Sequence, residues 1–371
     1  MIGEKELKKT LMMLIILIVA FNIAFFSKGA LGRTSNDDTV QFIEKWLKND
    51  DGALATYMKE TVEADEDKVQ GREALSESLG LWMLYTVESD DKERFEESFR
   101  ILSEAFMSKD GFITWKLPEN GSAREDTNAL VDDLRIYKAL VSAHRKWKEP
   151  EYQTTADKIG AFLGDHLIFQ SVMVDFYDRF YDYQTKSITL SYLDPEAIEL
   201  LNENGHLTSF SYEKILGVLH NMPMHNGFYP KTYHIDKNRM VYDEEINMID
   251  QLLVAINRSQ LGYGSEELME FINQQLSERG VLNGRYSMET KEAMVDYESP
   301  AIYGFVILQA IHSEEKELAT KAYKRMVEFR VTRSKYKGAY SINEKQNTHI
   351  FDNLVPLLAI ERLKNIGWVQ E

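Results

Sequence analysis

Carboxylic acids stand at or near the start of most of the apolar helical segments in this sequence. They are Glu77, Asp132 and Asp133, Asp194, Asp243 and Glu244, Glu298, and Asp352. Acids at helix starts commonly cap free backbone N–H groups and oppose the helix dipole, an effect of about 0.3–2 kcal/mol each. In an enclosed ring the same acids would lie together, and repulsion and desolvation would raise some of their pKa values. One protonated and one ionised carboxyl group in a cleft can hydrolyse a glycosidic bond.

Aromatic residues accompany these acids in the segments between helices. Flat apolar rings suit the cleft of a sugar polymer, and core packing is the competing explanation for each of them. We expect a substrate-binding set made of one acid and six aromatic residues: Asp132, Trp115, Phe228, Tyr229, Tyr192, Tyr242 and Tyr286.

The charge of the chain limits its partners. Among 371 residues, 60 are acidic and 43 are basic, which gives a net charge of -17. This excess opposes binding to nucleic acid or to an anionic membrane surface, and it favours a neutral or cationic polymer as substrate. The sequence contains no cysteine. Disulfides, cysteine nucleophiles, thiolate metal sites and a lipid-modified cysteine are therefore excluded.

The first 36 residues have the pattern of a signal peptide or membrane anchor. Lys5, Lys8 and Lys9 precede an apolar run from Leu11 to Phe26. Basic residues before such a run place the amino terminus inside the cell and the following chain outside. We therefore expect a leader over 1–36 in contact with the membrane. The working domain, 37–371, is expected as a monomer at the extracellular face of the membrane or in secreted form.

Two kinds of helical pattern alternate along this domain. Amphipathic stripes, as in FEESFRILSEAF and KELATKAYKRMVEF, predict helices with one solvent-exposed face. Segments such as LGLWMLYTV, AIYGFVILQAI and LVPLLAIERL are apolar on most sides and predict enclosed helices.

Short turns recur between the two kinds of helix and reveal a repeat. Their glycines, Gly52, Gly111, Gly227, Gly284 and Gly338, are separated by 59, 116, 57 and 54 positions. Because 116 is twice 58, one copy has decayed, which gives six units of outer helix, extended arm and inner helix. Such units can close into an (α/α)6 toroid, an all-α ring of six hairpins with short β arms. An open solenoid is the alternative.

Three segments resemble glycoside hydrolase family 8, the bacterial endoglucanase and chitosanase family. LSESLGLWMLY, 75–85, looks like the segment around that family's catalytic acid, where a Ser-Glu pair opens an inner helix. VDDLRIYKALVSA, 131–143, resembles its second signature, and MVYDEEINMIDQLL is similar to the segment of its general base. The family has the same six-fold helical toroid, and the resemblance extends over the whole extracytoplasmic part.

The resemblance implies a role for three acids. Glu77 takes the role of proton donor, Asp133 that of the aspartate that holds the sugar, and Asp243 that of the base. Glu244 or Asp250 could replace Asp243, because an arginine usual after the family's base is missing here. The family inverts the anomeric centre, so acid and base should lie about 6.5–9.5 Å apart, with a water molecule between them. The pattern looks closest to a branch that cleaves an exopolysaccharide of the biofilm matrix, without a cofactor.

Other chemistries are less well supported or make different predictions. His220, His225 and His234 form no compact zinc motif, and neither a serine elbow nor a nucleotide-binding glycine motif is present. A polysaccharide lyase is an alternative, with Tyr192, Tyr242, His225 or His234 as base. A second alternative is a catalytically inactive glycan-binding component of exopolysaccharide export.

Overall fold

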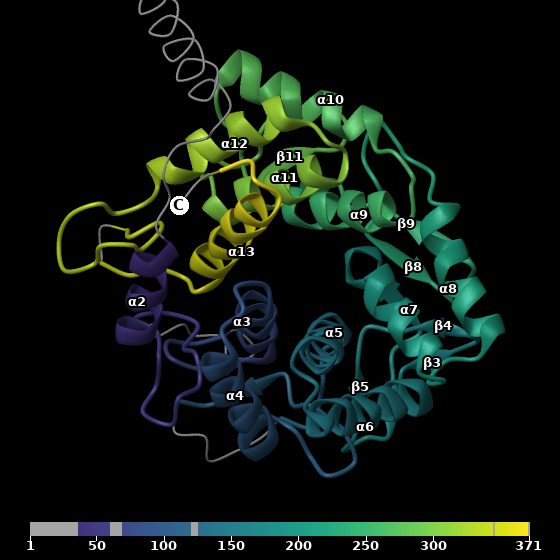
Figure 1. Cartoon of the computed structure of the whole chain (residues 1–371). Helices are drawn as coiled ribbons and strands as arrows, with labels where there is room; N and C mark the ends of the chain where they lie inside the picture. The colour runs from purple at the N-terminus through teal and green to yellow at the C-terminus, as the bar shows by residue number, and fades with distance from the viewer. Residues whose placement is uncertain (1–35, 60–68, 120–124, 344–345, 370–371) are drawn as a thin grey trace, which may run out of the picture.

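Helices of two kinds alternate along the chain because most of the alternate segments carry apolar residues on most of their faces. The computed structural model describes residues 36–59, 69–119, 125–343 and 346–369, in which twelve α-helices form two concentric layers (Figure 1). Except for Asn36, the predicted leader lies outside the described residues. None of the described helices is long and apolar enough to span a membrane.

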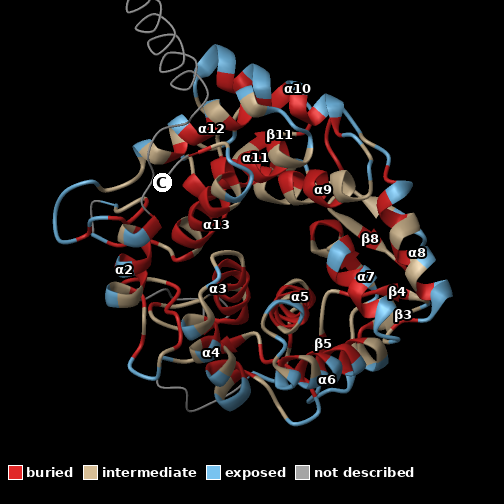
Figure 2. Ribbon diagram, viewed as in Figure 1, coloured by how far each residue is buried: buried red, intermediate tan, exposed pale blue. Residues whose placement is uncertain are grey.

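The inner layer contains the five helices whose sequences are apolar on most sides, together with one short helix. They are α3 (Ser76–Glu88), α5 (Leu130–Trp147), α7 (Pro195–Glu203), α9 (Met248–Gln260), α11 (Pro300–His312) and α13 (Phe351–Asn365). Nearly every residue of α3 and α11 is buried, as the red ribbons in Figure 2 show. The decayed copy is α7, which is the shortest inner helix and is preceded by the 3-10 turn η2 (Leu190–Tyr192).

The outer layer contains the amphipathic helices, which expose one face to solvent (Figure 2). They are α2 (Asn36–Trp46), α4 (Lys92–Ile101), α6 (Pro150–His166), α8 (Ser209–His220), α10 (Glu266–Gln274) and α12 (Lys316–Glu328). One π-helical turn extends α4, namely η1 (Leu102–Phe106), and another extends α10, namely η3 (Gln275–Arg279).

The ring is closed, so the open solenoid is excluded. Each inner helix packs against the next, and the last one, α13, packs against the first, α3. The outer layer closes as well, because the turn at Gly338 lies against the backbone of α2. A Cβ atom at Gly338, whose φ is +93°, would fall 2.1 Å from the carbonyl oxygen of Asp38. Gly111 has the same φ and lies equally close to Lys158 of α6. At these two turns, the repeated glycine therefore allows close contact with the backbone of the next outer helix.

The extended arms form small antiparallel sheets. Two-stranded pairs are β1 (Ala74–Leu75) with β2 (Lys116–Leu117), β3 (Ile168–Phe169) with β4 (Val172–Met173), β5 (Tyr177–Asp178) with β6 (Tyr183–Gln184), and β10 (Glu245–Asn247) with β11 (Arg285–Ser287). A three-stranded sheet has the order β7 (Ser187–Thr189), β8 (Thr232–His234), β9 (Arg239–Val241). Because β1 leads directly into α3 and β10 directly into α9, these sheets determine where the inner helices begin.

The two ends of the ring differ. The first turns of α3 and α5 lie together at one end, where Ser76 donates a hydrogen bond to Asp132, and we call this end the mouth. The opposite end, the floor, carries their last turns. Asn36, the first residue of α2, donates a hydrogen bond of 2.9 Å to Glu361, near the end of α13. The described chain therefore begins at the floor.

Candidate active site

Glu77 is the second residue of α3 and lies at the mouth. The helix begins here because β1 ends at Leu75, and the Ser76 N–H donates to the carbonyl oxygen of Trp115 at 2.9 Å. From this position the carboxyl group points away from the apolar body of α3, and its side chain keeps 29% of its surface exposed. Most of the residues that follow it on α3 are buried.

Asp132, in the first turn of α5, is connected to the start of α3 by direct contacts and lies near Glu77. One Asp132 oxygen accepts a hydrogen bond of 2.9 Å from the Ser76 hydroxyl, and the other accepts one of 3.0 Å from Arg135. The same Arg135 nitrogen lies 3.9 Å from Glu77 Oε1. Two acids and one arginine from adjacent inner helices therefore share one site.

The Glu77 carboxyl group keeps its proton up to a much higher pH than a solvated glutamate does. Burial and the nearby Asp132 charge together raise its pKa from 4.5 to about 7, against the opposing charge of Arg135. Desolvation disfavours the charged form of an acid, and a like charge acts in the same direction. A carboxyl group in this state can donate a proton at neutral pH.

Asp133 points to a different side of α5 from Asp132. Its side chain is almost fully buried, with the residue 1% exposed, and one oxygen accepts a hydrogen bond of 2.5 Å from Asn128. The other oxygen, Oδ1, has no hydrogen-bond partner within the described structure. Burial raises the pKa of Asp133 well above its usual value. The structure thus places Asp133 behind the exposed surface of the site, with one polar atom unused.

Tyr192 lies at the end of η2, where several of these acids converge. Burial raises the pKa of its hydroxyl group, and the charges of Asp175, Asp250, Asp132 and Glu77 add to the rise. Asp250 accepts a hydrogen bond of 2.8 Å from Ser191, and burial raises its pKa.

Asp175 is an acid of this site that the sequence did not suggest, since it begins no helix. It accepts hydrogen bonds from the backbone N–H and the hydroxyl group of Thr189, at 2.6 and 3.2 Å. Burial raises its pKa.

Asp243 lies in the loop between β9 and β10, not at the start of α9. Its side chain is 40% exposed and forms an ion pair of 2.9 Å with Lys231, a residue that the sequence did not single out. The positive charge of Lys231 also opposes the rise in the pKa values of Asp175 and Asp250. Asp243 lines a groove of about 940 Å³ formed by His225, Asn226, Tyr242, Asp243, Glu244, Glu245, Ser287, Met288, Glu289 and Met294.

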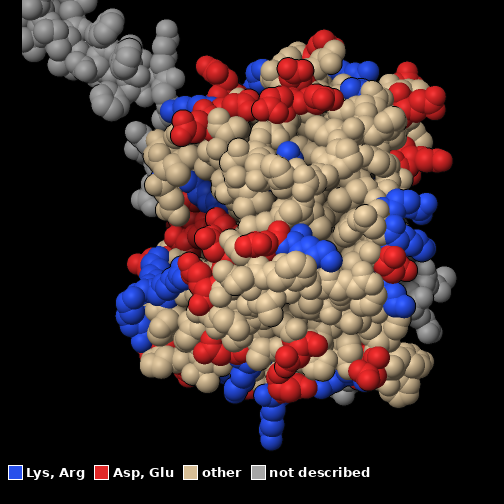
Figure 3. All heavy atoms as spheres, turned by 90° about the vertical axis from the view of Figure 1, so that its right-hand side faces the viewer, with Lys and Arg blue, Asp and Glu red and all other residues tan. Residues whose placement is uncertain are grey.

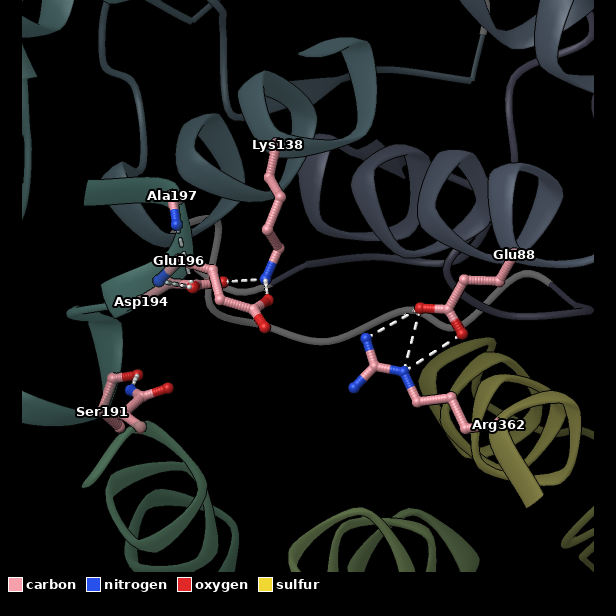
Figure 4. A network of polar contacts seen from close by, with 8 residues as sticks. Glu88, Lys138, Ser191, Asp194, Glu196, Ala197 and Arg362 are labelled. Atoms are coloured by element: carbon pink, nitrogen blue, oxygen red, sulfur yellow. Dashed lines mark hydrogen bonds and ion pairs between the residues drawn. The ribbon is translucent and has the colours of Figure 1, made fainter. Parts of the chain in front are cut away.

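The remaining acids in the predicted set serve the scaffold. Asp194 caps α7 through the N–H groups of Glu196 and Ala197 and pairs with Lys138. Figure 4 shows this group inside the ring, together with the pair between Glu88 and Arg362.

Glu298 and Asp352 also have partners within the scaffold. Glu298 pairs with Arg325, and Asp352 accepts a hydrogen bond from Ser299. For these acids, capping and charge pairing are sufficient explanations of their positions.

The six predicted aromatic residues differ in their exposure to solvent. Phe228, Tyr229 and Tyr286 are at most 1% exposed, so they belong to the core and cannot form a sugar platform. Phe228 and Tyr286 both pack edge-on against Phe271 of α10, which explains their burial. Three of the predicted rings remain accessible in part: Trp115, Tyr192 and Tyr242.

Two of these accessible rings lie beside the candidate acids. Trp115 adjoins the first residue of α3, and Tyr242 lines the groove beside Asp243. Within the described residues, no group of three His, Cys, Asp or Glu side chains could hold a metal ion.

The outer surface agrees with the net charge of the sequence. In Figure 3, acidic side chains gather along the upper edge of the molecule, at the level of α10 and η3, which expose Glu266, Glu267, Glu270 and Glu278. Elsewhere on this face, acids and bases are interspersed.

Comparison with known proteins identifies the family. Residues 35–174 match the model of glycosyl hydrolases family 8. A curated relative, "Putative lipoprotein YdaJ" of Bacillus subtilis, is 37% identical over 333 residues, which cover 89% of this chain and 87% of the relative. The chain belongs to glycosyl hydrolases family 8. As a family 8 member it is a glycoside hydrolase, and the (α/α)6 toroid is the fold of its family.

Solved structures share the fold of this family 8 member. A protein described as a novel alpha-amylase from Clostridium perfringens is 29% identical, with a TM-score of 0.80 and coverage of 89% of this chain and 99% of that one. PssZ from Listeria monocytogenes is 26% identical, with a TM-score of 0.72 and coverage of 89% and 96%. A family 8 endoglucanase from Klebsiella pneumoniae, 16% identical with a TM-score of 0.61 and coverage of 89% and 100%, shares the fold.

Proposed function

We propose that this family 8 member is an extracytoplasmic enzyme that hydrolyses an exopolysaccharide of the biofilm matrix by an inverting acid/base mechanism. The observation that carries the proposal is the environment of Glu77, a half-buried acid at the mouth whose pKa is raised to about 7. The apolar leader pattern and the lipoprotein name of the Bacillus subtilis relative support an extracytoplasmic location.

In this mechanism Glu77 protonates the oxygen of the glycosidic bond, and the bond to the anomeric carbon breaks. Asp243 takes a proton from a water molecule, which attacks the same carbon from the opposite face of the sugar. The Asp243 side chain is 40% exposed, so water reaches it, and the adjoining groove leaves room for a polymer. Glu244 and Asp250 are the alternative bases, and both lie close to Asp243 in the chain.

Asp133 and three accessible rings complete the proposed site. The Oδ1 atom of Asp133, which has no partner, is suited to a hydrogen bond with a sugar hydroxyl group. Because Asp133 is buried, a neighbouring side chain must move before a sugar can reach it. Asp132 stands beside the donor. Trp115, Tyr192 and Tyr242 are the rings available for contact with sugars, because each keeps part of its surface exposed.

The first experiment measures reducing-end release from purified matrix polysaccharide by residues 37–371 and by Glu77→Gln. We expect the variant to lose release by a factor of about 10²–10⁴ while its folding is unchanged, because an amide cannot donate the proton. Glu93→Gln is the matched control, since Glu93 is likewise the second residue of a helix, α4.

Other outcomes of this experiment support other functions. An unsaturated product that absorbs ultraviolet light identifies a lyase. Polymer binding that persists in Glu77→Gln, together with an absence of release in the wild type, identifies a glycan-binding scaffold. An α-linked glucan belongs in the substrate panel, because the Clostridium perfringens relative is described as an alpha-amylase.

The base is assigned by comparing Asp243→Asn, Glu244→Gln and Asp250→Asn. We expect Asp243→Asn to cause the largest loss of kcat, because the other two substitutions leave the proton acceptor in place. A larger loss in either of the others transfers the role to that residue.

A further inference from the structure

Arg135 lies between the two acids at the start of the inner helices α3 and α5. Its Nη1 atom is 3.0 Å from Asp132 Oδ1 and 3.9 Å from Glu77 Oε1. The side chains of Arg135 and Asp132 are only 10% and 7% exposed. A buried charge is costly unless a partner compensates it, so this arginine and Asp132 stabilise each other.

The local sequence explains how the guanidinium group reaches this place. Arg135 follows Asp132 by three positions, so the two side chains lie on the same face of α5. Gly80 of α3 lies directly opposite, where an added Cβ atom would be 3.1 Å from the Arg135 Cβ atom and 3.3 Å from Ile136. The glycine therefore allows α3 and α5 to approach closely, which brings Arg135 beside the first turn of α3.

The charges that face Glu77 come from two elements. Asp132 and Arg135 belong to α5 and act on Glu77 in opposite directions, and the Tyr192 hydroxyl group belongs to η2. Arg135 also faces Asp194 at the start of α7, whose main cation is Lys138. Burial raises the pKa of Asp132, and Arg135 is the cation that opposes this rise beside the candidate donor.

We propose that Arg135 is a positioning residue for the proton donor: by holding Asp132 ionised and in place, it determines how readily Glu77 keeps its proton. The proposal rests on the proposed role of Glu77 as the acid. Arg135 itself does not contact the substrate in this scheme. Its guanidinium group contacts Asp132 directly and lies slightly farther from Glu77.

The proposal predicts opposite shifts in two single variants. In Arg135→Met, two buried carboxyl groups are left without their cation and share a proton. The pH at which Glu77 loses its proton should therefore rise by about 1 unit or more. In Asp132→Asn, the neighbouring anion is lost while the cation stays, so the proton should be lost at lower pH. The double variant removes both charges and should return towards the wild type, because burial remains.

Two measurements report on these shifts. The alkaline limb of kcat/KM against pH follows the donor in the free enzyme. Independently of activity, a ¹³C-glutamate NMR titration follows the Glu77 carboxyl resonance, which is assigned by its absence in Glu77→Gln. If the enzyme shows no hydrolysis, the proposed function fails, yet the titration still tests the role of Arg135.

Lys138→Met is the matched control for a merely structural effect. Lys138 lies on the same helix, its side chain is 11% exposed, and it pairs with Asp194 and Glu196 (Figure 4). Its loss should lower stability without moving the Glu77 titration. Arg135→Lys, which keeps the charge, should preserve the wild-type titration and remains informative if Arg135→Met does not fold.

The proposal is overturned if Arg135→Met and Asp132→Asn shift the Glu77 titration in the same direction, or if neither shifts it. It is also overturned if Lys138→Met produces the same shift as Arg135→Met.

Discussion

Glu77 derives its proposed chemistry from its neighbours rather than from its residue type. A solvated glutamate has a pKa of about 4.5 and would be ionised at neutral pH. Burial at the start of α3, with Asp132 nearby, raises the pKa of Glu77 to about 7. The outer helix α4 also carries a glutamate as its second residue, Glu93, but that side chain is exposed to solvent. Position within the ring, and not position within a helix, distinguishes the two.

The raised pKa of Glu77 predicts the pH dependence of hydrolysis. The donor acts only in its protonated form, so kcat/KM should be high below about pH 7 and should fall about tenfold per pH unit above it. The test is kcat/KM measured from about pH 4 to pH 9 in buffers of constant ionic strength. An alkaline limb near pH 4.5, the usual pKa of a glutamate, would contradict the assignment of Glu77 as donor.

Some residues of the candidate site could be predicted from the sequence, and others could not. Glu77 and Asp132 lie in segments with recognisable patterns, and the structure places them in one site. Lys231 and Asp175 come from the arms, where no periodic pattern predicts which side chain faces inwards. Phe228 and Tyr286 were misassigned because an aromatic residue after a turn fits a core position as well as a sugar platform.

Close packing between inner helices depends on particular glycines. On α11, Gly304 faces α13, and an added Cβ atom would lie 2.8 Å from Val355 Cγ1 and 3.3 Å from the Val355 backbone. On the outer helix α8, Gly217 has no heavy atom within 4 Å of the same position. Both glycines are helical, so they differ mainly in their surroundings.

These two glycines give a matched prediction for alanine substitution. Gly304→Ala should lower the free energy of unfolding by about 1–3 kcal/mol, because the backbone of α13 cannot easily move away. Gly217→Ala should leave the free energy unchanged or raise it by up to about 1 kcal/mol, because alanine favours the helix. Urea unfolding monitored by circular dichroism measures both. Equal effects of the two substitutions would show that the α11 and α13 contact is less tight than described.

The elements were predicted better than their connections. Five inner helices are apolar on most sides and could be recognised, whereas α7 is short and follows an irregular arm. The pairing of β1 with β2, in which Leu75 lies opposite Lys116, joins segments about 40 positions apart in the sequence. Strands of two or three residues carry too little pattern to indicate such partners.

Closure of the ring requires the last inner helix to be held against the first. Arg362 of α13 donates to both carboxylate oxygens of Glu88 of α3, at 2.8–3.1 Å (Figure 4). The side chains are 24% and 22% exposed, so solvent screens the pair only in part. The sequence repeat predicted six units, but only contacts between α13 and α3 show that they close.

Loss of this ion pair should weaken the whole molecule. Arg362→Met should lower the free energy of unfolding by about 1–3 kcal/mol, because a partly buried Glu88 loses a bidentate partner. Arg145→Met, which breaks an exposed pair with Glu203, should cost less than about 1 kcal/mol. Thermal unfolding of the two variants makes the comparison. A cost for Arg145→Met that equals or exceeds the cost for Arg362→Met would argue against a special role for the closing pair.

The start of α2 has a consequence for how the enzyme meets a polymer. Asn36 is bound to the last turns of α13, at the floor, while Glu77 opens to the opposite side. If the predicted leader anchors the domain at residue 36, the attachment point is at the floor, and the proposed active site at the mouth faces away from it. A long glycan strand could then be gripped and cut at a distance from the anchoring surface, without threading beneath the protein.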